Sequence, residues 1–478
     1  MANDKWKMIR SRVTILDPLI FYGLIAVMVL TAIPYGTHES GSESLFECAV
    51  FFLAWLWIVH GFLEGSWRIG NTRLLAPMLG LVVLAVVQSL TWWQVDSAGE
   101  KVWFALSSDF FETRAFAFKV AALVLAALLI IRFTSNAKRL GILVHTIIVV
   151  ALASALFGVL RQSTQHGPGF VLARLQPESG YAQFINKNHF AFLMELAFGL
   201  ILGVALMRRG RSERLLLYLS ALLLIFTAMV LCNSRGGLLT ITVQVIFAGL
   251  LFVNSRGPAK DKGPNDQRGW VGPQRSWVGL TRSIVVTSVM IVALLFIIVA
   301  GVAWLGGDQL LTGVETATTE MAVDVSEAHE GARRRDIWRA TWLMFKAHPI
   351  AGAGLGGYWA EVPVFHEASG TSTPQQAHND YLELLSSGGI LGAGLLIWFV
   401  IALLKQAKQS VNTTEGSQRA VTLGAIIGLV GVGVHSIVDF GLHITINALL
   451  FVVLVAIVSL KSFGSTSTRE AVRSVPPA

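Results

Sequence analysis

The chain has 478 residues, of which 54% are hydrophobic and only 14% are charged, and its mean hydropathy is +0.63. Soluble proteins carry about a quarter charged residues, so this composition excludes an ordinary soluble domain and predicts an all-α integral membrane protein. The net charge of +8 agrees with a membrane topology in which basic residues collect in the inner loops, and no nucleic-acid partner is expected.

Apolar runs of about 18 residues or more, long enough to cross a bilayer as a helix, recur along the whole chain. They predict about twelve membrane spans, near residues 16–34, 45–64, 74–91, 114–131, 140–161, 189–207, 215–232, 238–254, 283–305, 387–404, 420–440 and 444–460. The first run is followed by THESGSES rather than a small-residue cleavage site, which favours a retained helix over a removed signal peptide.

These spans predict four parts of the chain. Residues 1–305 hold spans one to nine, and residues 306–386 form a large periplasmic loop that contains short amphipathic helices. Residues 387–462 hold the last three spans, and residues 463–478 form a disordered cytoplasmic tail. With both termini in the cytoplasm, most of the 37 Lys and Arg residues lie in inner segments, as the positive-inside rule requires.

Ionisable residues inside the predicted spans are unevenly distributed, and such residues usually mark function. Lys119, Glu195, His435 and Asp439 all lie in the outer halves of their spans, and His435 and Asp439 share one helical face at i, i+4 spacing. A transporter would place such residues near the midplane, so the pattern favours a site at the outer leaflet. The alternatives are a transporter, a snorkelling Lys119 and a purely structural Glu195.

Two short outer segments carry further polar residues. The stretch QFINKNHFAFLMEL places Lys187, Asn188 and His189 at the outer mouth of the sixth span, with Glu195 nearly two turns below. The stretch CNSRGGLL places Arg235 at a tight outer turn, where it either binds an anion or caps the seventh helix.

The periplasmic loop contains GARRRDIWRATWLMFKAHP, in which Arg335 and Arg339 are one turn apart and aromatic residues recur at helical intervals. This pattern predicts an amphipathic helix at the membrane surface. Guanidinium groups bind phosphates in a bidentate way, which indicates a lipid phosphate or diphosphate ligand, with ordinary headgroup binding as the alternative. The following AGAGLGGY matches GxGxxG without a preceding strand, so a flexible loop or an anion nest is favoured over a dinucleotide site.

The stretch AHNDYLELLSSGGILG contains the best candidate for a general base. His378 would lie at the outer mouth of the tenth span, where a neutral imidazole can accept a proton from a hydroxyl group. A structural histidine is the alternative. Asn379 and Asp380 belong either to the same reaction centre or to the cap of the helix YLELL.

Together these stretches resemble the O-antigen ligase and polymerase family of bacterial membrane glycosyltransferases. The matching pieces are FINKNHFAFLMEL, NSRGGLL, RRRDIWRATWLMFKAHPIAGAGLGGY, AHNDYLELLSSGGILG and HSIVDFGLHITINALL, between about residues 184 and 450. The resemblance implies a GT-C-like helical bundle in the bacterial inner membrane. It also implies a glycan donor on undecaprenyl diphosphate and an acceptor that is lipid A-core in ligases or a second lipid-linked repeat in polymerases.

The resemblance also assigns roles to residues. His378 would activate the acceptor, and Arg235, Lys187 and one or both of Arg335 and Arg339 would hold the donor diphosphate. The supporting residues would be Asn188, His189, Glu195, Asn379, Asp380, His435 and Asp439. The NKNHF form resembles members from exopolysaccharide clusters, which tilts the choice slightly towards polymerase. A lipid-linked glycan flippase or other membrane transporter is the alternative function.

Chemistry from the residues agrees with this assignment. Diphosphate is a good leaving group, and cations stabilise the charge that develops as it departs. A single-displacement, inverting transfer then needs one base and no covalent intermediate. The chain contains no DxD motif, so we expect neither a metal nor a cofactor. Cys48 and Cys232 both lie near outer helix ends, where plain packing is favoured over a disulfide.

Overall fold

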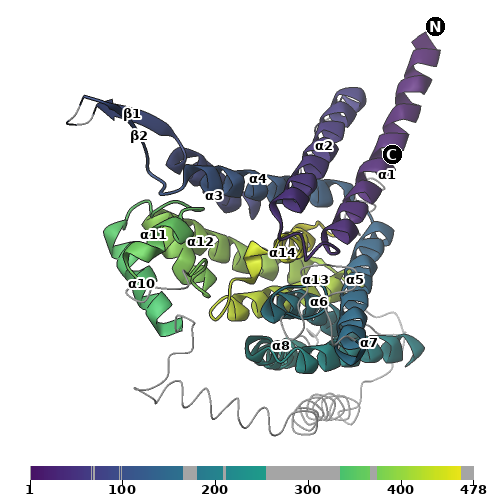
Figure 1. The fold of residues 1–478 in the computed structure, drawn as a ribbon. Coiled ribbons are helices and arrows are strands. Elements are labelled where there is room, and N and C mark those ends of the chain that lie inside the picture. Colours follow the sequence, from purple (N-terminus) through teal and green to yellow (C-terminus); the bar gives the residue numbers. More distant parts are fainter. Residues whose placement is uncertain are drawn as a thin grey trace, which may run out of the picture.

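The computed structural model describes residues 2–65, 70–95, 99–164, 180–207, 212–254, 334–366 and 374–463, together with Trp67 and Ser97. Helices dominate this part of the chain, and one β-hairpin projects from it (Figure 1). The first eight helices are α1 (Ala2–Thr31), α2 (Ser40–Glu64), α3 (Leu75–Gln88), α4 (Phe110–Phe133), α5 (Ala137–Thr164), α6 (Lys187–Met207), α7 (Ser212–Leu231) and α8 (Arg235–Asn254). They are followed by α10 (Arg334–Ala347), α11 (Tyr358–Glu361), η1 (Val362–Val364), α12 (Asp380–Thr413), α13 (Gly416–His435), η2 (Gly441–His443) and α14 (Thr445–Ser459).

The helices confirm a multi-pass membrane protein. Every predicted span except 283–305, which lies outside the described residues, coincides with a helix. Among the described helices, six are long and apolar enough to cross a membrane: α2, α4, α5, α6, α12 and α13. Shorter apolar helices accompany them in α1, α3, α7, α8 and α14. The predicted linker 255–282, residues 306–333 and 367–373 of the loop, and the tail after Phe463 also lie outside the described residues.

Helices α6 and α13 form the centre of the bundle. Most of α6 is buried on all sides, as expected for a helix that is apolar around its whole circumference. Its backbone approaches α13 so closely that a Cβ atom on Gly203 would lie 2.2 Å from the Cα of Gly424. Small residues at such a crossing allow close packing of membrane helices, which fixes the relative position of α6 and α13.

Contacts between helix ends agree with the predicted alternation of helix direction. At one end of the bundle, the side-chain amide of Asn447 donates to the carbonyl of His189 at 3.0 Å. At the other end, Gln418 donates to the carbonyl of Lys461 at 2.9 Å, and Arg139 pairs with Asp17. The predicted outer ends therefore meet one another, as do the predicted inner ends.

A β-hairpin departs from the all-α prediction. Strands β1 (Thr91–Val95) and β2 (Lys101–Ala105) pair antiparallel with Trp93 opposite Trp103, and they connect α3 to α4. Hydropathy did not reveal this hairpin, because its two five-residue strands are far shorter than the apolar runs of about 18 residues that mark membrane spans.

The short helices of the large loop pack on α12 rather than standing apart. The buried face of α10, which includes Ala340 and Met344, shares a small core with Tyr358 of α11 and with Ala377. The GxGxxG stretch is the connection between α10 and α11. A Cβ atom on Gly354 would lie 2.0 Å from the hydroxyl of Ser107, so this loop packs tightly on the protein. The backbone N–H groups of residues 352–357 all donate to acceptors within the protein, so the anion nest is wrong.

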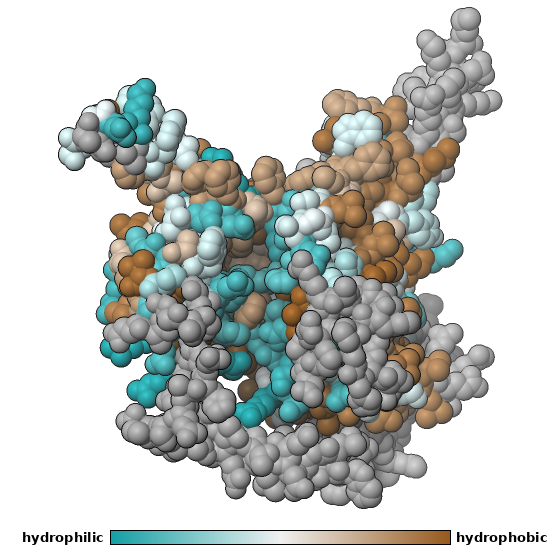
Figure 2. Space-filling view, viewed as in Figure 1, coloured by the Kyte–Doolittle hydropathy of each residue, from teal (hydrophilic) through white to brown (hydrophobic). Residues whose placement is uncertain are grey.

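Helix α12 begins earlier than the predicted span 387–404 and includes the YLELL segment. Gly389 interrupts it with a φ of 60° and a ψ of −160°, so a short first section meets the longer apolar section at a kink. Hydrophilic side chains gather near the centre of the face shown in Figure 2, between hydrophobic surfaces that suit a lipid environment.

Candidate functional site

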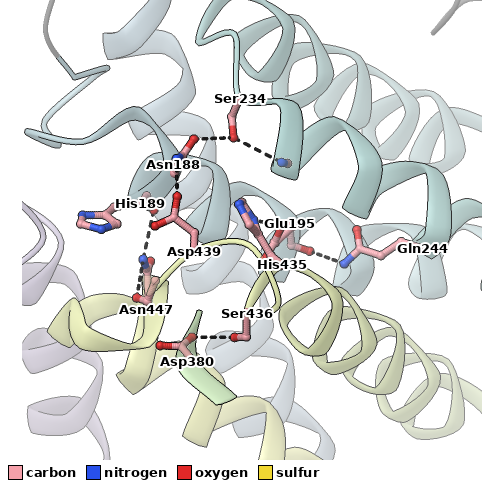
Figure 3. A network of polar contacts seen from close by, with 12 residues as sticks. Asn188, His189, Glu195, Ser234, Gln244, Asp380, His435, Ser436, Asp439 and Asn447 are labelled. Atoms are coloured by element: carbon pink, nitrogen blue, oxygen red, sulfur yellow. Dashed lines mark hydrogen bonds and ion pairs between the residues drawn. The ribbon is translucent and has the colours of Figure 1, made fainter. Parts of the chain in front are cut away.

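Asp439 is the centre of a polar network at the predicted outer end of the bundle (Figure 3). Its side chain is buried, and one oxygen lies 3.5 Å from Nδ1 of His378 and accepts the backbone N–H of Phe440 at 2.9 Å. The other oxygen accepts a hydrogen bond from Asn188 and lies 3.9 Å from Arg334. Burial alone would raise the pKa of Asp439, but the contacts with His378 and the Phe440 N–H outweigh it and lower the pKa, so the carboxylate stays ionised.

The prediction that His435 and Asp439 share a helical face within one span is wrong. Helix α13 ends at His435, and Asp439 lies in the loop that leads to η2. The two side chains have different main partners, because the chain turns after Ser436 and carries Asp439 towards Asn188 and His378.

Asn188 connects the network to α8. Its side-chain oxygen accepts a hydrogen bond from Ser234 at 2.9 Å, and Ser234 in turn accepts the backbone N–H of Gly237 at 3.2 Å in the first turn of α8. A serine in this position is a typical helix N-cap. Lys187 and Arg235 are the first residues of α6 and α8, and both are exposed beside this network.

The backbone around His378 is held on both sides. The N–H of Ala377 donates to Glu383 at 2.7 Å, and its carbonyl accepts the indole N–H of Trp338 at 2.9 Å. Asn379 accepts two backbone N–H groups of the first turn of α12, which confirms that it caps this helix. His378 itself has a φ of +51°, a left-handed conformation that costs about 1–2 kcal/mol in a non-glycine residue. These contacts offset that cost and aim the ring at Asp439.

Sequence reasoning missed Trp338 and Glu383 as partners of the Ala377 peptide. Their only signal was position: Trp338 belongs to the aromatic series of the amphipathic helix, and Glu383 lies one turn after the cap Asn379.

Phe440 packs among three histidines and was also missed. Its ring meets those of His189 and His378 edge-on, each at a centroid distance of 4.8 Å, and that of His443 at 5.9 Å. His189 is 5% exposed, and its Nε2 has no hydrogen-bond partner within the described residues. Phe440 therefore contacts all three imidazoles, of which His189 is buried and the side chains of His378 and His443 are 32% and 34% exposed.

Glu195 and His435 form a separate buried pair below Asp439. The carboxylate lies 2.9 Å from Nδ1 of His435, and the ring of Phe192 stacks on His435 at 4.2 Å. A Cβ atom on Gly236 would lie 2.6 Å from the Nε2 atom of His435. This geometry matches the structural alternative for Glu195, because the pair joins α6 to α13 under the start of α8.

Asp380 connects α12 to the end of α13 beside the site. Its backbone N–H donates to the carbonyl of Ser436 at 3.0 Å, and its carboxylate accepts the Ser436 hydroxyl at 2.7 Å. These two bonds join the start of α12 to the end of α13, so the segments that carry His378 and Asp439 are held side by side.

His443 and Lys119 complete this side. His443 lies 3.2 Å from Glu383; burial, with a smaller effect of Lys119, lowers its pKa to about 3 and keeps the ring neutral. The ammonium group of Lys119 donates to the His443 carbonyl at 2.7 Å and pairs with Glu43 at 2.6 Å, so it has defined protein partners.

The arginines of the loop line up along α10. Arg335 and Arg339 are both exposed, and Arg334 is the one within 3.9 Å of Asp439. The sequence pattern singled out Arg335 and Arg339 because they are one helical turn apart, and it did not single out Arg334.

No group of three or more His, Cys, Asp or Glu side chains within the described residues could hold a metal ion. Cys48 and Cys232 are unpaired, the first exposed and the second buried.

A helical bundle with membrane-spanning helices and a buried carboxylate–histidine network at one end defines a multi-pass membrane protein with an enzyme-like site. The family model of the O-antigen ligases matches residues 220–399, so this part of the chain is similar to that family and the resemblance is confirmed. The match includes Arg235, the α10 arginines and His378, whereas Asn188 and Asp439 lie outside it. It indicates glycan transfer of the O-antigen ligase or polymerase type on a lipid-linked glycan. No curated relative matches the chain.

Proposed function

We propose that the protein is an inverting glycosyltransferase of the bacterial inner membrane. It transfers a glycan from undecaprenyl diphosphate to an acceptor hydroxyl on the periplasmic face, as an O-antigen-type polymerase or ligase. The observation that carries this proposal is the pairing of His378 with the buried, ionised Asp439 at the end of the bundle where the polar residues gather.

His378 acts as the general base in this proposal. Asp439 lies near Nδ1 and stabilises a proton there, which leaves Nε2 to accept the proton of the acceptor hydroxyl. The separation of 3.5 Å is longer than a hydrogen bond, as is common in catalytic pairs without substrate. The hydroxyl oxygen bonds to the anomeric carbon as the bond from that carbon to the diphosphate oxygen breaks, and the acceptor proton goes to His378.

The donor diphosphate binds the cations at the mouth of the site. Arg235 and Lys187 are exposed at the first turns of α8 and α6, where helix N-termini add favourable positive potential. Arg335 and Arg339 on α10 approach from the loop side, and their planar groups suit a bidentate grip on phosphate oxygens. The leaving diphosphate needs this positive charge most as the bond to the sugar breaks.

The test uses purified protein in nanodiscs with an undecaprenyl-diphosphate glycan and two acceptors, lipid A-core and a second lipid-linked repeat. The wild type should extend one of them, and His378→Ala should lose that product. His145→Ala is the matched control, because His145 is exposed on α5 at the opposite end of the bundle.

The acceptor that is used separates polymerase from ligase. Full transfer by a folded His378→Ala would refute His378 as the base. Absence of transfer by the wild type to both acceptors would contradict the proposed reaction and favour the flippase alternative, which vesicle assays of glycan translocation measure directly.

A further inference from the structure

The hairpin between α3 and α4 carries large aromatic side chains on both of its faces. Trp93 and Trp103 lie opposite each other on one face, and Trp92 and Phe104 form the pair on the other face. Their exposed fractions run from 41% for Trp92 to 64% for Trp103. The hairpin projects away from the helices in Figure 1, so its aromatic side chains face the surroundings rather than a protein core.

An aqueous environment does not explain this hairpin. A lone two-stranded hairpin is marginally stable in water, and it gains stability when its side chains find an apolar surface. A single protein partner would cover one face and leave the other aromatic pair in water. A lipid interface, by contrast, surrounds both faces at once.

The position of the hairpin between α3 and α4 indicates that lipid headgroups surround it. Strand β1 begins three residues after α3, and β2 ends shortly before α4, which is long and apolar enough to cross a membrane. Trp is enriched where membrane helices meet the headgroups, since one edge of the ring is polar and the rest is apolar. Phe111 in the first turn of α4 is 69% exposed and continues the same aromatic surface.

The polar backbone groups of the hairpin limit how deeply it can lie in the membrane. Both outer edges of a two-stranded sheet carry unpaired N–H and C=O groups, which the hydrocarbon core does not tolerate. Lys101 lies with its ammonium group 4.7 Å from the centroid of the Trp93 ring, so a cation accompanies the aromatic pair where anionic phosphates would be. The hairpin therefore fits the headgroup layer and not the acyl chains.

We propose that the β1–β2 hairpin is an interfacial anchor that inserts its aromatic side chains among the lipid headgroups at the end of the bundle that carries the candidate site. The base of the hairpin is tied to the protein, because Ser107 donates to the carbonyl of Gln88 at 3.0 Å and Ser108 donates to Glu361 at 2.7 Å. The anchor thus holds α4 and the α10–α11 segment at a constant height. This inference rests on the membrane spans and is independent of the proposed reaction.

The test places an environment-sensitive fluorophore on single accessible cysteines in full-length protein in nanodiscs, in a Cys48→Ser background in which the remaining Cys232 is buried. The hairpin probe is Val95→Cys, and Val83→Cys on α3 is its matched control within the bilayer, since these valines are 58% and 57% exposed. Glu415→Cys, in the exposed connection between α12 and α13, reports water. Nitroxide lipids with the label near the headgroup or near the acyl-chain end, and aqueous iodide, serve as quenchers.

We expect the Val95 probe to be quenched more by the shallow than by the deep nitroxide lipid and to be less accessible to iodide than the Glu415 probe. The Val83 probe should show the opposite lipid preference. A Val95 probe that behaves like the Glu415 probe would place the hairpin in water and overturn the proposal. Protection from iodide without quenching by either lipid would indicate a protein partner and would also overturn it.

Discussion

Asp439, in the loop after α13, lies 3.5 Å from Nδ1 of His378, which immediately precedes the N-cap of α12. Neither residue belongs to a regular helix, and the two bonds between Asp380 and Ser436 hold the segments that carry them together. The pair therefore depends on the joint between two helix ends, and variants on either side of that joint test its role.

The first prediction concerns coupling within the pair. Since general acid–base catalysis contributes about 10²–10⁴-fold, His378→Ala should lower kcat by that order. Asp439→Asn keeps the shape of the side chain but removes its charge, and it should lower kcat less. The double variant should be no slower than His378→Ala, because Asp439 acts through the histidine. Initial rates of the four proteins measure this cycle, and multiplicative losses would show that the residues act separately.

The second prediction follows from the lowered pKa of Asp439. Its pKa in the folded protein lies below the unfolded value of about 3.9, so ionised Asp439 stabilises the fold at higher pH, and this stabilisation is lost as pH falls through the folded pKa. The difference in thermal stability between wild type and Asp439→Asn should thus be constant above about pH 5 and shrink in acid. Unfolding temperatures across a pH series in detergent measure it. A difference that grows in acid would contradict the lowered pKa.

The third prediction tests the hydrogen bond from the indole N–H of Trp338 to the carbonyl of Ala377. Trp338→Phe keeps the aromatic volume but removes the indole N–H, so the Ala377 carbonyl loses a hydrogen bond worth about 0.5–1.5 kcal/mol. We expect kcat to fall with little change in the KM of the donor, because His378 loses its fixed orientation. Trp342→Phe on the same helix is the control, as Trp342 is 47% exposed. Equal effects of the two substitutions would assign Trp338 a merely structural role.

The fourth prediction concerns the close approach of α8 to His435. Gly236→Ala should destabilise the protein by about 1–3 kcal/mol, since the new methyl group would displace the imidazole from its pairing with Glu195. Gly141→Ala in α5 meets open space and should be neutral or slightly stabilising, because alanine favours the helix. Thermal unfolding in detergent compares the two variants. A tolerated Gly236→Ala would show that the α8–α13 contact is loose.

The fifth prediction is metal independence. The arginines of α8 and α10 would supply the positive charge that a divalent ion provides in nucleotide-sugar transferases. Transfer should persist in excess EDTA and gain nothing from added Mg²⁺ or Mn²⁺. Loss of activity in EDTA with recovery on adding a divalent ion would require a metal site beyond the residues named above.

The sequence by itself determined the class of the protein and the segments that supply the polar residues of the candidate site. Apolar length and loop charge are local properties, so they predicted the helices and the gathering of polar residues at one end. The N-cap formed by Asn379 could also be predicted from the sequence, because an N-cap depends only on the residues of the helical turn that it begins. The family motif around His378 could likewise be recognised without a fold.

Only the tertiary structure decided which polar groups meet. Helical spacing suggested that His435 and Asp439 act together, yet the chain turns between them. As a result His435 pairs with Glu195. Asp439 instead contacts Asn188 and His378. Such contacts depend on how distant helices and strands are placed against one another, and the spacing of residues along one segment carries no record of that placement.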